Sequence, residues 1–108
     1  MVKINSLPVL FRGKDMEQKL EKVCGDNDVS LLALFGSFVH GQATRKSDVD
    51  LVVQFDHPTD KSLLDLIRTE RQMGRVFKRK VDMVTLDGLS PYIKKDVLRT
   101  MRVIYERG

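Results

Sequence analysis

The chain has 108 residues, a net charge of +4 and hydrophobic residues at 42% of its positions. We expect one globular domain over residues 1–108, because separate cores generally need a longer chain. No apolar run approaches the roughly 20 residues that span a bilayer, and the N-terminus lacks the pattern of a signal peptide. The single cysteine, Cys24, excludes an internal disulfide and indicates a cytoplasmic protein, in which we expect it to be a small apolar residue on a helix.

The positive charge is concentrated in the second half of the chain. The basic residues of its densest stretch are Arg68, Arg71, Arg75, Lys78, Arg79 and Lys80. Such a stretch can attract a polyanion, such as a nucleoside triphosphate, an RNA or an acidic protein, or it can be a solvated helix face. Aromatic residues make up only 6% of the chain and tryptophan is absent, which disfavours direct nucleic-acid binding.

The first half of the chain predicts a helix followed by two strands. Apolar residues recur at helical spacing over residues 15–24, and Gly25 can end that helix. Residues 30–35 and 49–55 are short apolar runs bounded by turn residues, so both are predicted as buried strands.

The second half predicts two more helices and a third strand. A helix is expected over residues 60–78, although Glu70 interrupts its apolar period, and a strand over residues 80–85. Ser90 and Pro91 have the pattern of an N-cap and first position of a last helix. The expected buried residues of the longer helix are Leu63, Leu66, Ile67, Met73, Val76 and Phe77. Those of the last helix are Ile93, Val97, Met101 and Ile104.

This order of elements predicts an α/β (α+β) fold, with a small mixed sheet of three to four strands packed with helices. Gly36-Ser37 lies at the exit of the first strand and Asp48 at the entrance of the second, so they can meet only if these strands are antiparallel. A whole helix joins the second and third strands, which favours a parallel, right-handed crossover.

Three carboxylates are the candidate metal ligands. Asp48 and Asp50 alternate along a predicted strand, so their side chains share one face and can share a hard cation such as Mg²⁺. Asp82 enters the third strand at the same end. An aspartate within an apolar strand is disfavoured by propensity, and a third carboxylate is what a pair of metal ions would need.

Gly36-Ser37 is the candidate phosphate-binding turn. Glycine lets the backbone approach a ligand closely, and a helical turn from Ser37 would offer free N–H groups and a hydroxyl to a phosphate. A Gly-Ser pair alone is usually only a turn, and Asp-x-Asp alone is more often a loop or a cap. Their conjunction at compatible strand ends favours a metal–nucleotide site.

Gly36-Ser37, ten intervening residues and Asp48-Val49-Asp50 together resemble the signature of the DNA polymerase beta-like nucleotidyltransferases. The short chain and the segments 81–84 and 89–93 resemble the minimal nucleotidyltransferases, which are often antitoxins of HEPN/MNT toxin–antitoxin pairs. The resemblance covers about residues 30–106 and implies the polymerase beta-like nucleotidyltransferase fold.

By position, the resemblance implies that Asp48, Asp50 and Asp82 are catalytic residues and metal ligands, and that Gly36 and Ser37 hold the triphosphate. It implies Mg²⁺ as cofactor, with two ions, and ATP as substrate. The implied reaction transfers AMP to a hydroxyl of a HEPN-domain RNase toxin, on a tyrosine, and so neutralises it. Asp82 would lie nearest the acceptor and could serve as general base.

Two alternatives stay open from the sequence. The chain could be an antitoxin that neutralises its partner by contact alone, or a small-molecule nucleotidyltransferase of the antibiotic-modifying type. The latter is disfavoured because the second, acceptor-gripping domain of larger relatives is not expected here. His40 stands where family members often have arginine, and we expect it to be a surface residue.

Overall fold

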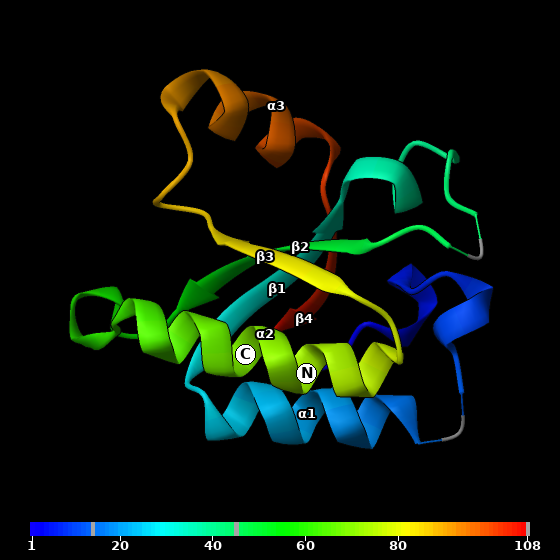
Figure 1. Ribbon diagram of the computed structural model, residues 1–108, viewed down its shortest axis with the longest axis horizontal. Coiled ribbons are helices and arrows are strands. Elements are labelled where there is room, and N and C mark those ends of the chain that lie inside the picture. Colours follow the sequence, from blue (N-terminus) through cyan, green and yellow to red (C-terminus); the bar gives the residue numbers. More distant parts are fainter. Residues whose placement is uncertain (14, 45, 108) are drawn as a thin grey trace.

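A four-stranded mixed sheet with helices on both faces organises the chain (Figure 1). The computed structural model describes residues 1–13, 15–44 and 46–107. The strands are β1 (Val29–Phe35), β2 (Val49–Phe55), β3 (Val81–Thr85) and β4 (Arg102–Glu106). They lie in the order β3-β2-β1-β4, so β3 and β4 are the two edges.

The predicted strand directions are confirmed. β1 and β2 are antiparallel, and β2 and β3 are parallel across the crossover helix. β4 pairs antiparallel with the other side of β1. The end of β1 and the starts of β2 and β3 therefore meet at one end of the sheet.

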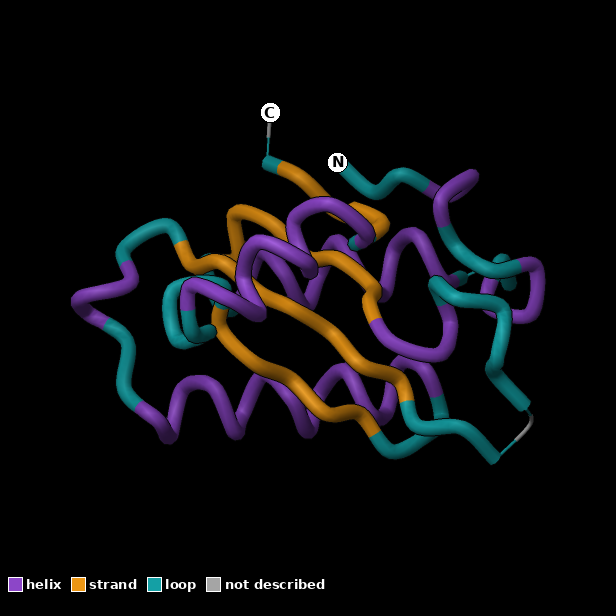
Figure 2. Tube along the Cα trace, turned by 90° about the horizontal axis from the view of Figure 1, so that it is seen from above, coloured by secondary structure: helices purple, strands orange, loops and turns teal. Residues whose placement is uncertain are grey.

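Three α-helices cover the sheet: α1 (Met16–Asp26), α2 (Leu63–Phe77) and α3 (Pro91–Thr100). α1 and α2 pack side by side on one face, and α3 lies over the opposite face (Figures 1 and 2). Short 3₁₀ turns are η1 (Ile4–Ser6), η2 (Val9–Phe11), η3 (Gly36–Phe38) and η4 (Pro58–Asp60). No helix among the described residues is long and apolar enough to cross a membrane.

The core has a larger and a smaller half, because alternate residues of each strand point to opposite faces. Leu51 and Val53 of β2 enter the core below α1 and α2, whereas Val52 faces α3. Cys24 is fully buried on α1, and burial raises the pKa of its thiol to about 12. The expectation of a small apolar residue on a helix is confirmed by its burial.

The expected end of the last helix was wrong. The N-cap prediction is confirmed, since the Ser90 hydroxyl accepts from the Ile93 N–H, but α3 ends at Thr100. Met101 has an extended backbone, and Ile104 belongs to β4 and is fully buried against β1. Branched and aromatic residues favour strands, and here the pairing with β1 decides the structure.

α2 starts later and buries a different stripe than expected. Ser62 and Asp65 form a capping box that begins the helix at Leu63. Met73, Val76 and Phe77 are buried as predicted, but Leu63 and Ile67 are 70% and 36% exposed because they lie off that stripe, on which Thr69 is buried. Leu66 is half-buried.

Two other sequence features have a structural explanation. The carboxylate of Glu70, which breaks the apolar period, accepts a hydrogen bond of 2.9 Å from the Met83 N–H on the edge strand β3. This contact satisfies a backbone donor that an edge strand would otherwise present to solvent. Gly25 lies inside α1 rather than ending it, and the C-cap is Asn27.

Candidate active site

The Gly-Ser turn passes directly against a carboxylate. β1 ends at Phe35, and Gly36 follows with φ of +74°, a left-handed conformation that favours glycine. A Cβ atom at this position would lie 2.4 Å from Oδ2 of Asp50. Any side chain would therefore displace the carboxylate, so glycine is required here for both conformation and space.

One 3₁₀ turn, η3, carries Ser37 away from the strand. The Val39 and His40 N–H groups both donate to the Gly36 carbonyl, at 3.0 and 3.2 Å. The Gln42 N–H donates to the Ser37 carbonyl at 3.0 Å. The helical turn begins one residue earlier than the sequence predicted, and His40 is exposed, as expected.

Strand register brings the predicted aspartates to the same end of the sheet. Asp50 of β2 lies between Phe35 of β1 and Asp82 of β3, because it is the Cα partner of both residues. Asp48 directly precedes β2. Asp50 and Asp48 are half-buried, and Asp82 is exposed. The turn and the carboxylates thus share one open edge.

Among residues 1–13, 15–44 and 46–107, the one ion pair of these three carboxylates is that of Asp48 with Lys80. Burial raises the pKa of the Asp50 carboxyl, and the negative charges of Asp82 and Asp48 raise it further. The Nζ of Lys80 lies 3.9 Å from Oδ2 of Asp48, a distance at which an exposed pair contributes little. The site is therefore an anionic edge that favours binding of a cation.

Residues 1–13, 15–44 and 46–107 contain no preassembled group of three His, Cys, Asp or Glu side chains that could hold a metal ion. The carboxylates converge by backbone register, while their mutual repulsion favours separated side chains. Their all-oxygen chemistry and the close approach of Gly36 fit a hard divalent cation with bound phosphate.

Two hollows of the described structure lie away from this edge. One of about 440 Å³ lies beside Phe77 and Arg79, and another of about 340 Å³ lies beside Phe55 and Lys61. Neither is lined by the aspartates of the site. Register and charge therefore locate the candidate site better than concavity does.

Sequence reasoning did not single out Arg79, which it grouped with the basic stretch. Its Nη1 donates to the carbonyl oxygens of Thr44 and Ser47, at 3.1 Å each, whereas Arg68, Arg71 and Arg75 are exposed on α2. The sequence signal was weak: an arginine directly after a helix end, on a loop leading to the Asp82 strand.

Comparison with known proteins agrees with this geometry. The family model described as "Polymerase beta, Nucleotidyltransferase" matches residues 18–108. The chain belongs to this family of nucleotidyltransferases, as the resemblance predicted.

Within the family, the chain is a minimal nucleotidyltransferase that resembles MntA. The protein adenylyltransferase MntA of Thermococcus cleftensis is 38% identical over 68% of this chain and 71% of that protein. A solved structure provisionally assigned as a minimal nucleotidyltransferase is 31% identical, with a TM-score of 0.67, over 80% of this chain and 85% of that one.

Two more distant structures share the fold. A toxin–antitoxin complex with AMP-PNP matches with a TM-score of 0.68 at 24% identity, over 84% of this chain and 73% of that one. A complex of tri-AMPylated Shewanella oneidensis HEPN toxin with MNT antitoxin matches with a TM-score of 0.61 at 21% identity, over 85% of this chain and 71% of that one.

Proposed function

We propose that this chain transfers AMP from ATP to a tyrosine hydroxyl of a HEPN-domain RNase toxin and thereby neutralises the toxin. The observation that carries the proposal is the packing of Gly36 against Asp50, with Asp82 paired beside it. Support for the donor and acceptor comes from the similarity to MntA, a protein adenylyltransferase, and to complexes with AMP-PNP or an AMPylated HEPN toxin.

Asp48, Asp50 and Asp82 are the residues that would hold Mg²⁺, two ions in our proposal. When bound, the cation supplies charge neutralisation of the triphosphate and of the reacting oxygens. The raised pKa of Asp50 supports this role. Burial is its main cause, and a divalent cation would relieve the repulsion from Asp82 and Asp48 that raises it further.

Ser37 and the backbone of Gly36 would bind the β- and γ-phosphates and hold ATP across the sheet end. The acceptor oxygen attacks the α-phosphorus, a new O–P bond forms, and the bond from this phosphorus to the β-phosphate oxygen breaks. Pyrophosphate leaves, and the hydroxyl proton passes to Asp82, the most exposed of the three carboxylates.

The test is transfer of label from α-labelled ATP, with Mg²⁺, to a HEPN-domain RNase toxin supplied as the partner. We expect the wild type to label the partner and Asp48→Asn to reduce the rate at least 100-fold, a loss typical of a removed catalytic group. Asp26→Asn is the matched control, because Asp26 is an exposed carboxylate on α1 that pairs with Lys22.

The same experiment tests neutralisation by contact. If the wild type transfers no label and Asp48→Asn still neutralises the partner's RNase activity fully, the chain acts as a binding antitoxin and our proposal is wrong. Transfer of label to a small hydroxylated molecule instead of the partner would favour the antibiotic-modifying alternative.

A further inference from the structure

Arg79 lies where three segments of the chain meet. It follows the C-cap of α2, where Lys78 has a left-handed backbone and the Arg79 N–H donates to the Gly74 carbonyl at 3.2 Å. The guanidinium carbon lies 5.5 Å from the ring centroid of Phe11 and 5.6 Å from that of Phe38. Both distances are in the range of cation–π contacts.

The aromatic contact connects Arg79 to the Gly-Ser turn. Phe38 is the last residue of η3, next to Ser37. Its ring packs against Phe11 at a centroid distance of 5.3 Å, and Phe11 packs edge-on against Phe77 of α2 at 5.0 Å. Arg79 therefore lies over a ring that is anchored in the core and belongs to the turn.

The polar contacts connect Arg79 to the turn before Asp48. Its Nη1 donates to the carbonyls of Thr44 and Ser47. These two residues also form hydrogen bonds with each other. The Thr44 N–H donates to the Ser47 hydroxyl at 2.7 Å, and the Ser47 N–H donates to the Thr44 carbonyl at 3.1 Å. Asp48 directly follows Ser47 in the chain, so the position of this turn determines where the Asp48 side chain lies.

We infer that Arg79 is a positioning residue, which holds the η3 turn and the turn closed by Thr44 and Ser47 in a fixed relation and so fixes where Asp48 enters the site. The inference rests on the proposed function, since it gives Arg79 a task in binding nucleotide with metal. The partners described for Arg79 are carbonyl oxygens and ring faces rather than the aspartates of the site. In these contacts Arg79 does not compete with a metal ion for the carboxylates.

Lysine would perform this task poorly. A guanidinium is planar, stacks on rings and directs its donors in fixed directions, whereas an ammonium is a compact, strongly hydrated charge. Arg79→Lys should therefore show a smaller form of the Arg79→Ala defect. Phe38→Leu removes the Phe38 ring from both Arg79 and Phe11 and leaves the polar contacts of Arg79. Combined with Arg79→Ala, it should add less than its separate effect.

The first measurement is amide hydrogen exchange of the ligand-free protein. In Arg79→Ala, the Thr44 and Ser47 amides should exchange roughly tenfold faster, as expected for loss of hydrogen bonds that close a turn. The Val49 amide, which donates to the Lys80 carbonyl at 2.9 Å, is the internal reference for the sheet. If Val49 accelerates equally, Arg79 merely stabilises the whole domain, and if Thr44 and Ser47 do not change, Arg79 does not hold their turn. Either result contradicts the inference.

The second measurement is calorimetric binding of a non-hydrolysable ATP analogue at increasing Mg²⁺. The half-saturating Mg²⁺ concentration should rise roughly fivefold to tenfold in Arg79→Ala, less in Arg79→Lys, and remain unchanged in Arg75→Ala. Arg75 is a matched control because it is an exposed arginine one turn earlier on α2. Binding is measured well below the unfolding midpoint of each variant, where the protein is essentially all folded and loss of stability cannot shift the half-saturating concentration.

The two proposals fail in different ways. A wild type that binds the analogue, with the same Mg²⁺ dependence in Arg79→Ala, contradicts the positioning role and leaves the proposed function standing. A wild type that binds no analogue at any Mg²⁺ concentration contradicts the proposed function and the inference with it, whatever the amide exchange shows.

Discussion

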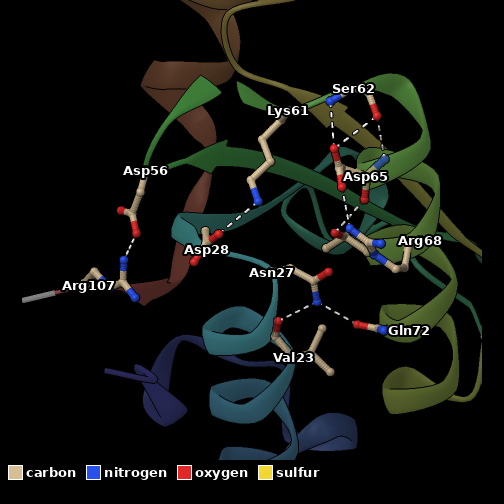
Figure 3. A network of polar contacts seen from close by, with 11 residues as sticks. Val23, Asn27, Asp28, Asp56, Lys61, Ser62, Asp65, Arg68, Gln72 and Arg107 are labelled. Atoms are coloured by element: carbon tan, nitrogen blue, oxygen red, sulfur yellow. Dashed lines mark hydrogen bonds and ion pairs between the residues drawn. The ribbon is translucent and has the colours of Figure 1, made fainter. Parts of the chain in front are cut away.

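Carboxylates at the two ends of the sheet differ in how they are compensated. Where β1 begins and β2 finishes, Asp28 pairs with Lys61 at 3.0 Å and Asp56 pairs with Arg107 (Figure 3). Nearby, the Asp65 carboxylate accepts from the Ser62 N–H and pairs with Arg68. The hydrogen bond from Lys61 lowers the pKa of Asp28, and the bond from the Ser62 backbone lowers that of Asp65.

At the other end, backbone register brings Asp48, Asp50 and Asp82 to one edge, and the charges of Asp82 and Asp48 act on Asp50. Burial and these neighbours raise the pKa of Asp50, the reverse of the shift at Asp28. One sheet thus has a stabilising end, where acids are paired, and an end where acids repel. Repulsion costs folding free energy, so the second arrangement indicates a ligand that supplies positive charge.

The largest expected effect is at the repelling end. Gly36→Ala places a Cβ 2.4 Å from Asp50 Oδ2, so the carboxylate must move. We expect transfer of AMP to fall at least 100-fold, and the free energy of unfolding to fall by about 2 kcal/mol from the clash and the left-handed backbone. Label transfer and urea denaturation measure the two effects.

Gly41→Ala is the control for that variant. Gly41 also has a positive φ, +71°, but nothing lies within 4 Å of an added Cβ. It should lose about 1 kcal/mol of stability and keep most of the transfer rate. Equal losses of transfer in both variants would mean that backbone strain, not contact with Asp50, explains the requirement for glycine.

A smaller effect is expected at the paired end. Ser62→Ala removes the capping box of α2 and should cost about 1 kcal/mol of stability. Thermal denaturation should show a midpoint lower by roughly 5 °C. Transfer measured well below that midpoint should be unchanged, and a large loss of transfer would show that the two ends are not functionally separate.

The smallest effects concern pH, and they should have opposite signs at the two ends. The pKa of the Asp50 carboxyl is higher in the folded than in the unfolded protein. As pH rises from about 4 through the folded pKa, ionisation of Asp50 therefore lowers the free energy of unfolding. Asp50→Asn should therefore be more stable than the wild type at neutral pH, by less than about 1 kcal/mol, and equal to it below that window.

Asp28 is the counterpart at the paired end. Its pKa is lowered by folding, so its charge stabilises the protein above about pH 4, and this contribution is lost as pH falls through the folded pKa. Asp28→Asn should be less stable than the wild type at neutral pH, with a difference that vanishes in acid. Denaturation of both variants across pH tests the comparison, and two differences of the same sign would contradict it.

The geometry of the site was largely predictable, because short sequence spacings determine it. Gly36, Asp48 and Asp50 lie within one strand–turn–strand unit. They can meet only if β1 and β2 are antiparallel, which predicts the observed direction. The parallel crossover from β2 to β3 predicts that Asp82 lies at the same end of the sheet. In the structure Asp82 is the direct partner of Asp50. These inferences needed only strand alternation and connection length.

Long-range contacts were not predictable. The segment 102–106 continues the helical period of α3, and only its pairing with β1 makes it a strand. The role of Glu70 depends on the edge N–H of Met83, far along the chain. Arg79 contacts residues as distant as Phe11, which no local pattern connects with it.

The most direct test is the intact mass of the HEPN partner after incubation with ATP, Mg²⁺ and each variant of this chain. The wild type and Asp28→Asn should both add the mass of AMP to the partner, and Asp50→Asn should add none. That result would locate the chemistry at the end of the sheet where the acids repel. AMP addition by Asp50→Asn at the wild-type rate, or no addition by the wild type, would contradict this account.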